Sequence, residues 1–393
     1  MLYLDHNATT PVSPSVFKAM RPYFSEHFGN PASRHSAGWK AAAAVKQARE
    51  SLAASLGLLE ASSVIFTSGA TEANNLALKG VLEACGKKPA HLVTQITEHS
   101  CVLQSAHWLK AQGHEVTFLP VNALGRVSPE SLKAALKDNT VLVSIMHANN
   151  EIGTVQDIST LATLTHKAGA FFHTDAVQTL GRLPLDMAAM EIDLLTFSGH
   201  KLYGPKGIGA LAILPKRPKI NLIPLIHGGG HEQGLRSGTL NVPGIIGLAT
   251  AVSEAIKIRE SETARQIILR DELINQLMNT IEGATLNGDP QNRLPGNINL
   301  TIPFVKATDL ISTASEVAFS TGSACAASSV TPSHVLTAIG LSKEAAECTM
   351  RLGLGLGTTL ADIKTAAKIL VAAVQKLRAQ NPAWQMQQAQ EIK

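Results

Sequence analysis

The chain has 393 residues, of which 45% are hydrophobic and 16% charged, and its formal net charge is +4. This length suits one large and one smaller domain, and the composition is that of a well-packed protein without a bias toward disorder. The small net charge and the lack of a Lys/Arg block give no reason to expect direct nucleic-acid binding, whereas a mildly basic site for anionic ligands fits.

The N-terminus and the cysteines indicate the compartment. The first ten residues lack the basic and apolar regions of a signal peptide, and no uncharged apolar run reaches the roughly 18 residues of a membrane helix. Cys85, Cys101, Cys325 and Cys348 are scattered and form no Cys-x-x-Cys pair. We therefore expect no disulfide framework, no zinc knuckle, no membrane contact and a cytoplasmic location.

Short apolar or β-branched runs alternate with helical patterns through the first 250 residues. Strands are predicted at 64–67, 91–94, 116–119, 141–147, 170–175, 194–198 and 209–214, with helices that include 71–84, 100–112, 128–136 and 158–168. This alternation predicts an α/β fold with a mainly parallel sheet that is covered on both faces. Ligands of such folds bind at the carboxyl ends of the strands.

The pattern changes near residue 255. Residues 254–281 predict one long, charged amphipathic helix that leads into a second domain. Strands at 297–301 and 317–319 and helices at 332–339 and 359–378 predict a smaller α+β unit, and the Gln-rich residues after Asn381 predict a loose tail. The predicted division is a large domain at 14–255 and a small domain made of 1–13 and 256–393.

A lysine stands directly after the strand at 194–198. Lys201 is flanked by Ser198 and His200 and followed by glycines, without the spacing of a nucleotide-binding P-loop. A carbonyl-bearing cofactor needs such a lysine as the amine of a Schiff base, and Ser198 and His200 can hold a phosphate beside it. For the lysine alone, a surface residue on a glycine-rich turn is the commoner explanation.

Three other strand ends carry polar residues. Asp175 ends the strand at 170–175, where its carboxylate can pair with a protonated pyridine nitrogen, and Gln178 can reach a ring oxygen. Thr71 follows a glycine turn at a helix start that suits a phosphate, and His99 can stack on a flat ring and move protons. Each signal is weak alone, but together they predict one pocket.

The run at 320–329 (STGSACAASS) has no bulky side chain except the Cys325 thiol. Such a run packs poorly, and we expect it to be mobile enough to let one cysteine travel. Free cysteines are usually small buried hydrophobes. That interpretation suits Cys85, Cys101 and Cys348, but it fits Cys325 badly.

The sequence resembles the cysteine desulfurases of the NifS/IscS group, which are class V, fold-type I pyridoxal-phosphate enzymes. The shared motifs run nearly end to end: 3–11 (YLD…ATTP), 29–33 (GNPAS), 67–72 (TSGATE), 97–99 (TEH), 143–147 (VSIMH), 149–153 (NNEIG), 175–178 (DAVQ), 198–209 (SGHKLYGPKGIG), 227–232 (HGGGHE), 236–239 (RSGT) and 321–325 (TGSAC). The resemblance implies that the cofactor is pyridoxal 5'-phosphate and that the substrate is L-cysteine.

The resemblance also implies the role of each site residue. The implied cofactor ligands are Lys201 through a Schiff base, Asp175 at the pyridine nitrogen, Gln178 at the phenolic oxygen, His99 on the ring, Ala70, Thr71, Ser198 and His200 at the phosphate, and Thr239 at the partner subunit's phosphate. Asn150, which also borders the cofactor, and Arg351 are implied to receive the substrate carboxylate.

In the implied reaction, Lys201 moves the α-proton and the Cys325 thiolate attacks the substrate sulfur, which leaves alanine and a Cys325 persulfide. The family also implies a homodimer and a sulfur-acceptor protein, such as an iron–sulfur scaffold or a thiolation protein. No intrinsic metal is implied, although Cys325 can transiently ligate an iron–sulfur cluster together with a scaffold partner.

Other functions were weighed against this one. A selenocysteine lyase shares the same thiol loop, whereas an aminotransferase of class V would not need Cys325. A hydrolase is disfavoured because residues 227–230 (HGGG) are not accompanied by a Gly-x-Ser-x-Gly elbow. A non-enzymatic sulfur carrier is disfavoured because Lys201, His99 and Cys325 are all present.

Overall fold

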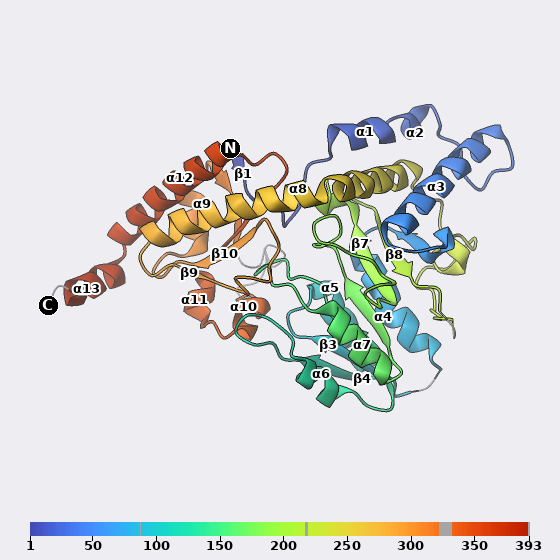
Figure 1. The fold of residues 1–393 in the computed structure, drawn as a ribbon, viewed down its shortest axis with the longest axis horizontal. Helices are drawn as coiled ribbons and strands as arrows, with labels where there is room; N and C mark the ends of the chain where they lie inside the picture. The colour runs from blue at the N-terminus through green and yellow to red at the C-terminus, as the bar shows by residue number, and fades with distance from the viewer. Residues whose placement is uncertain (87, 217–218, 322–331, 392–393) are drawn as a thin grey trace.

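The computed structural model describes residues 1–86, 88–216, 219–321 and 332–391 (Figure 1). Most of the small-residue run that we expected to be mobile falls in the gap at 322–331. Cys325 therefore lies outside the described residues.

A seven-stranded sheet forms the centre of the larger part of the chain, in the order β2-β8-β7-β6-β5-β3-β4. Its strands are β2 (Val64–Thr67), β3 (His91–Gln95), β4 (Glu115–Leu119), β5 (Thr140–Ser144), β6 (Phe171–Asp175), β7 (Leu194–Ser198) and β8 (Gly209–Ile213). Only β8 runs antiparallel to its neighbours β2 and β7. The predicted strands and the mainly parallel mixed sheet are confirmed, although β5 ends at Ser144 rather than at residue 147.

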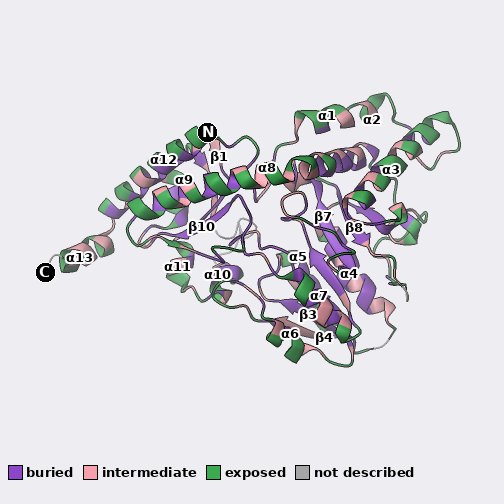
Figure 2. Cartoon of the chain, viewed as in Figure 1, coloured by how far each residue is buried: buried purple, intermediate pink, exposed green. Residues whose placement is uncertain are grey.

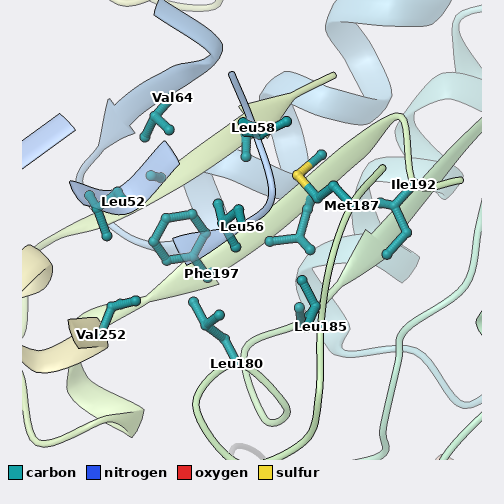
Figure 3. Close-up of a cluster of buried hydrophobic side chains, with 14 of the residues drawn as sticks. Leu52, Leu56, Leu58, Val64, Leu180, Leu185, Met187, Ile192, Phe197 and Val252 are labelled. Carbon is teal, nitrogen blue, oxygen red and sulfur yellow. The ribbon is translucent and has the colours of Figure 1, made fainter. Parts of the chain in front are cut away.

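Alternate residues of the strands face opposite sides of this sheet, as strand geometry requires. Leu92, Leu142 and Leu194 face α4 (Ala70–Ala84) and α5 (Ser100–Ala111). Val93, Val143 and Leu195 belong to the opposite core. Figure 3 shows part of that core, where Phe197 of β7 is surrounded by aliphatic side chains.

The opposite core is covered by α1 (Pro14–Met20), α3 (Ser36–Ser55), α6 (Pro129–Ala135), α7 (Ile158–Lys167) and the first half of α8 (Val242–Thr280). The short helix α2 (Pro22–Ser25) follows α1. Figure 2 shows the strands largely buried between these layers and the outer helix faces exposed. Both faces of the sheet are thus covered, which leaves the strand ends as the place for a site.

The helix predicted at 254–281 begins earlier, at Val242. Its first turns contain two residues that usually disfavour a helix, Pro243 and Gly247, and both are tolerated here. Pro243 stands in the first turn, where its missing N–H has no helical partner to lose. Gly247 is needed for close packing, because a Cβ there would lie 2.6 Å from the Met20 sulfur of α1. The helix joins two cores, with Leu248 in the first and Leu273 in the second (Figure 1).

The second core lies beside a four-stranded antiparallel sheet of order β12-β13-β10-β9. Its strands are β9 (Thr285–Leu286), β10 (Asn297–Thr301), β12 (Ser320–Thr321) and β13 (Thr349–Gly353), and the nearby helices are α9 (Ala307–Thr313), α10 (His334–Ala338), α11 (Lys343–Glu347) and α12 (Leu360–Ala379). This arrangement is the predicted smaller α+β unit. The exact division at 14–255 stays a prediction.

Both ends of the chain are tied to the smaller unit. The first strand, β1 (Leu2–Tyr3), pairs in parallel with β11 (Val317–Ala318), after which the chain crosses to the large sheet, where Thr10 N–H donates to the His200 carbonyl. The predicted loose tail was wrong, because residues after Asn381 form α13 (Pro382–Glu391). Trp384 of this helix packs on Arg378 and Phe304. This contact could not be predicted from the Gln-rich pattern.

Among the described residues, none of the helices combines the length and apolarity that crossing a membrane requires.

Candidate active site

One cavity of about 570 Å³ lies at the carboxyl ends of β2, β6 and β7. It collects the predicted residues Ala70, Thr71, His99, Asn150, Asp175, Gln178, Ser198, His200, Lys201 and Arg351. The predicted Thr239 is not part of this cavity, and Cys325 lies outside the described residues. The predicted pocket therefore exists, and the smaller unit contributes Arg351 to it.

The turn between β2 and α4 forms one end of the cavity. Gly69 stands at the N-cap of α4 and brings no capping side chain, so Ala70 and Thr71 open the helix beside the cavity. A Cβ on Gly209 would lie 2.7 Å from the Gly69 backbone, so this turn and β8 can approach only because Gly209 has none. A helix start of this kind presents backbone N–H groups to an anion.

Ser198 and His200 lie at the same end. The Ser198 hydroxyl donates to the Ile208 carbonyl at 3.3 Å, and His200 Nδ1 lies 3.2 Å from the Thr9 hydroxyl. Burial, together with the nearby positive charges of Lys201 and Lys206, lowers the pKa of His200 to about 4. His200 is therefore a neutral hydrogen-bonding group near pH 7.

Lys201 ends a short 3-10 turn, Gly199–Lys201, directly after β7. The turn is tight, because a Cβ on Gly199 would lie 2.9 Å from the Pro205 carbonyl oxygen. The Lys201 amine donates to the Asn7 carbonyl oxygen at 2.7 Å and also to the Ala8 carbonyl oxygen. The N-terminal segment therefore places the amine inside the cavity.

Asp175 is buried at the end of β6. Its Oδ2 accepts from Asn74 Nδ2 at 2.7 Å, and its Oδ1 accepts from the Val177 N–H at 3.0 Å. The Gln178 amide makes two hydrogen bonds with Asn7, donating to the Asn7 carbonyl at 3.0 Å and accepting from Asn7 Nδ2 at 3.2 Å. Acid and amide are thus fixed by residues from other segments.

His99 caps the first turn of α5, and Cys101 lies against it. The Cys101 N–H donates to His99 Nδ1 at 3.2 Å, so Nδ1 is an acceptor and the neutral ring carries its proton on Nε2. The Cys101 sulfur lies 3.0 Å from Nδ1 and accepts from Asn74 Nδ2 at 3.3 Å. The prediction that Cys101 is only a small buried hydrophobe was wrong, because its thiol lines the cavity.

Arg351 forms the opposite end of the cavity, on β13. Its side chain is 1% exposed, with Nη1 donating to the Asn150 carbonyl at 3.2 Å and Nη2 donating to Asp5 Oδ1 at 2.8 Å. Arg351 Nε has no hydrogen-bond partner among the described residues. A buried guanidinium edge at a cavity wall suits a carboxylate ligand.

Thr239 lies in a separate hollow of about 260 Å³, beside Tyr23, Phe28 and Asn30. The described residues of one chain thus do not bring Thr239 to the cavity. Its predicted contact with a phosphate needs a second subunit.

Among the residues that make hydrogen bonds to the predicted site residues, Asp5, Asn7, Asn74 and Cys101 had no role in the sequence prediction. Asn7 and Gln178 are 171 residues apart, and Asp5 and Arg351 are 346 apart. No local pattern joins such partners. Cys101, only two residues after His99, was the one that a helix-cap argument could have found.

Residues 2–365 match the family described as Aminotransferase class-V. The cysteine desulfurase IscS of Anaeromyxobacter dehalogenans is 45% identical over 386 residues, which cover 98% of this chain and 95% of that protein. The cysteine desulfurase IscS of Rickettsia felis is 43% identical over 388 residues, which cover 98% of this chain and 94% of that protein.

Solved structures give the same result. A NifS-like protein matches with a TM-score of 0.89 and 35% identity, covering 95% of this chain and 99% of its own. A structure described as SspA in complex with cysteine matches with a TM-score of 0.80 and 41% identity, covering 90% of this chain and 99% of its own.

These matches confirm the predicted fold-type I architecture and the resemblance on which the site was predicted. The chain belongs to the class-V aminotransferase family and, within it, to the cysteine desulfurases of the NifS/IscS group.

Proposed function

We propose that this chain is a pyridoxal-phosphate-dependent cysteine desulfurase, which converts L-cysteine to L-alanine and keeps the sulfur as a persulfide on Cys325. The observation that supports this most is the cavity itself, where Lys201, Asp175 and His99 face a wall that holds Arg351. An amine, an acid, an imidazole and a guanidinium in one cavity can hold a cofactor ring and an amino-acid carboxylate together.

The residues present fit pyridoxal phosphate. The start of α4 with Ser198 and neutral His200 suits its phosphate, and buried Asp175 suits its pyridine nitrogen. The buried Asn74 Oδ1 and Arg351 Nε lack partners among the described residues, which supports a bound ligand at this site. When bound, the cofactor supplies an aldehyde carbon and an electron-withdrawing ring that ease loss of an α-proton.

Each residue then has a distinct task. Lys201 holds the cofactor through its amine and, once released, moves the α-proton at Nζ. Asp175 keeps the ring nitrogen protonated, Gln178 binds the phenolic oxygen, and His99 covers the ring. Asn150 and Arg351 receive the substrate carboxylate, for which the planar guanidinium offers two parallel N–H groups.

The sulfur is taken by Cys325. Its thiolate attacks the sulfur of bound cysteine, the carbon–sulfur bond breaks with its electron pair left on carbon, and that carbon gains a proton to give alanine. The transferred sulfur stays on Cys325 as a persulfide until an acceptor thiol takes it. We propose a sulfur-acceptor protein, such as an iron–sulfur scaffold or a thiolation protein, as the partner.

We propose a homodimer with α1, α2, α3 and the loop before α3 in its interface. Four aromatic side chains are exposed there: Phe17 at 60%, Phe24 at 62%, Phe28 at 73% and Trp39 at 63%. Aromatic groups gathered on one face are typical of an interface. Phe28 also lines the hollow of Thr239, so the same contact would present Thr239 to the partner.

Light scattering tests the dimer directly. We expect a mass near twice the 41.5 kDa of one chain, falling toward one chain when Phe28 and Trp39 are both changed to Ser. A wild-type protein that stays monomeric at micromolar concentration would contradict the interface and the role of Thr239.

We also propose a cytoplasmic location, because Cys101 and Cys348 form no disulfide among the described residues, as is usual in a reducing compartment.

Alanine release tests the reaction. The purified holoenzyme is incubated with dithiothreitol and either L-cysteine or L-selenocysteine, and alanine is quantified together with sulfide or selenide. The proposal predicts equimolar alanine and sulfide from L-cysteine. Alanine from selenocysteine alone would make the chain a selenocysteine lyase, and 3-mercaptopyruvate in place of alanine would indicate transamination.

A further inference from the structure

Asp5, the acidic neighbour of Arg351, is the basis of a further inference. Among the described residues, Arg351 forms an ion pair with the carboxylate of Asp5, whose Oδ1 lies 2.8 Å from Arg351 Nη2. The other oxygen of Asp5, Oδ2, accepts from the Ser320 hydroxyl at 2.7 Å. Both oxygens are thus engaged, and the carboxylate cannot rotate away without losing two hydrogen bonds.

The three residues are brought together by the smaller unit. Ser320 of β12 pairs with Arg351 of β13, and Asp5 forms a bridge with Gly353 two residues further along the same strand. Asp5 therefore approaches the guanidinium from a fixed backbone position. The arrangement is built into the sheet and does not depend on a loop.

Asp5 lies behind the arginine and not in front of it. Arg351 lines the cavity, together with Asn7, Ala8 and Thr9 of the N-terminal segment, but Asp5 does not. Asp5 holds Nη2, the Asn150 carbonyl holds Nη1, and Nε has no partner among the described residues. The Nε edge is therefore the part of the fork left for a ligand.

We propose that Asp5 is the positioning residue for substrate-carboxylate recognition: it fixes the Arg351 guanidinium so that its Nε edge meets the carboxylate of L-cysteine. The inference rests on the proposed function for the identity of the substrate. Asp5 touches neither substrate nor cofactor, so its whole effect passes through Arg351.

Fixing the long Arg351 side chain before the substrate binds strengthens binding, because the entropic cost of ordering its Nε edge is then no longer part of the binding step. The negative charge of Asp5 matters as well, because a buried guanidinium without a carboxylate partner is an uncompensated buried charge and is destabilising. Asp5→Asn keeps the size of the side chain but removes its charge.

The experiment compares holoenzymes of wild type, Asp5→Asn and Asp289→Asn. Asp289 is a matched control, because it is buried, pairs with Arg126 at 3.5 Å and lies outside the cavity. For Asp5→Asn we expect the KM for L-cysteine to rise about tenfold with kcat nearly unchanged, as for loss of one charge-assisted hydrogen bond. The control should keep both constants.

Two probes separate positioning from general damage. 3-Mercaptopropionate carries the carboxylate and thiol without the amine, and its dissociation constant, measured from the change in cofactor absorbance, should rise about tenfold in Asp5→Asn, in line with KM. Cysteamine carries the amine and thiol without a carboxylate, and the absorbance change that it causes should need the same concentration in all three proteins.

A fall in KM for Asp5→Asn would overturn the proposal, because it would mean that Asp5 competes with the substrate. Unchanged binding of 3-mercaptopropionate would overturn it too. If Asp5→Asn proves unstable, Ser320→Ala frees one Asp5 oxygen and should shift the 3-mercaptopropionate constant in the same direction by a smaller factor. Because this constant needs no turnover, it remains readable if the wild type releases no alanine.

Discussion

The two ends of the cavity are built in different ways. The cofactor end comes from turns that directly follow β2, β6 and β7, so Thr71, Asp175 and Lys201 are placed by the edge of one sheet. The carboxylate end joins Arg351 of β13 to Asn150 and to Asp5, at sequence separations of 201 and 346 residues.

This difference explains which site residues can be predicted from the sequence. Where a fold forces strand ends together, each functional residue can be predicted from its own neighbours. Where the site also depends on residues from the smaller unit, a functional residue can be recognised only in the folded structure, together with its partners. The following predictions test this contrast, from the largest expected effect to the smallest.

Changing Lys201 to Ala should abolish both the visible absorbance of the holoenzyme and alanine release, because the cofactor end would lose its only proposed covalent attachment. Absorbance spectra of dialysed protein measure this. Lys206→Ala, at the same cavity but with an exposed side chain, is the control and should keep the band. An unchanged band in Lys201→Ala would refute the cofactor assignment.

At the carboxylate end, Arg351→Lys should leave the band intact but raise the KM for L-cysteine by roughly 10- to 100-fold, since a lysine cannot copy a two-pronged hydrogen bond. Steady-state kinetics check this. Arg270→Lys, on α8 and outside the cavity, should have little effect. Equal KM values for Arg351→Lys and wild type would mean that the carboxylate binds elsewhere.

Cys101→Ala should lower kcat/KM about fivefold, which corresponds to one neutral hydrogen bond to His99 Nδ1. The band should stay, since the Cys101 N–H still orients the ring. Cys85→Ala is the matched control, because Cys85 is also partly buried but does not line the cavity. Equal losses in both variants would mean that Cys101 contributes only packing.

A pH effect should be seen at Glu151, which lies next to Asn150. Burial raises the pKa of Glu151 from 4.5 to about 7, although the Ser333 hydroxyl donates to it at 2.5 Å. The folded protein therefore holds this proton more tightly than the unfolded chain. The stability that it contributes is present below about pH 4.5 and is lost as the pH rises through 7.

Glu151→Gln removes this titration. Its unfolding temperature relative to wild type should rise by several degrees between pH 4.5 and pH 7.5, as about 2–4 °C per kcal/mol implies for a large domain. Differential scanning calorimetry measures the shift. Glu50→Gln, which is exposed on α3, should show no such trend, and a flat Glu151→Gln difference would contradict the raised pKa.

Much of the fold could be predicted, since buried parallel strands are continuous apolar runs between turn signals. The start of α8 could not, because Pro243, Gly244 and Gly247 are weak helix formers. Pro243 is tolerated only because it stands in the first turn, and Gly247 is explained by the close approach of Met20. Nor could α13 be predicted, where one tryptophan contact outweighs a polar sequence. At the site, Lys201 and Asp175 follow predicted strands, but Asp5 and Asn7 act on partners too distant in sequence for any local pattern.

The central claim is that sulfur leaves cysteine and stays on one thiol. Mixing the yellow holoenzyme with L-cysteine, without reductant, and mapping persulfides by mass spectrometry tests it most directly. We predict one persulfide, on Cys325, with one alanine released, and neither in Lys201→Ala; Cys325→Ser should keep the visible band but form no persulfide. Sulfide released by Cys325→Ser at the wild-type rate, or a wild type that gives neither alanine nor persulfide, would contradict the account.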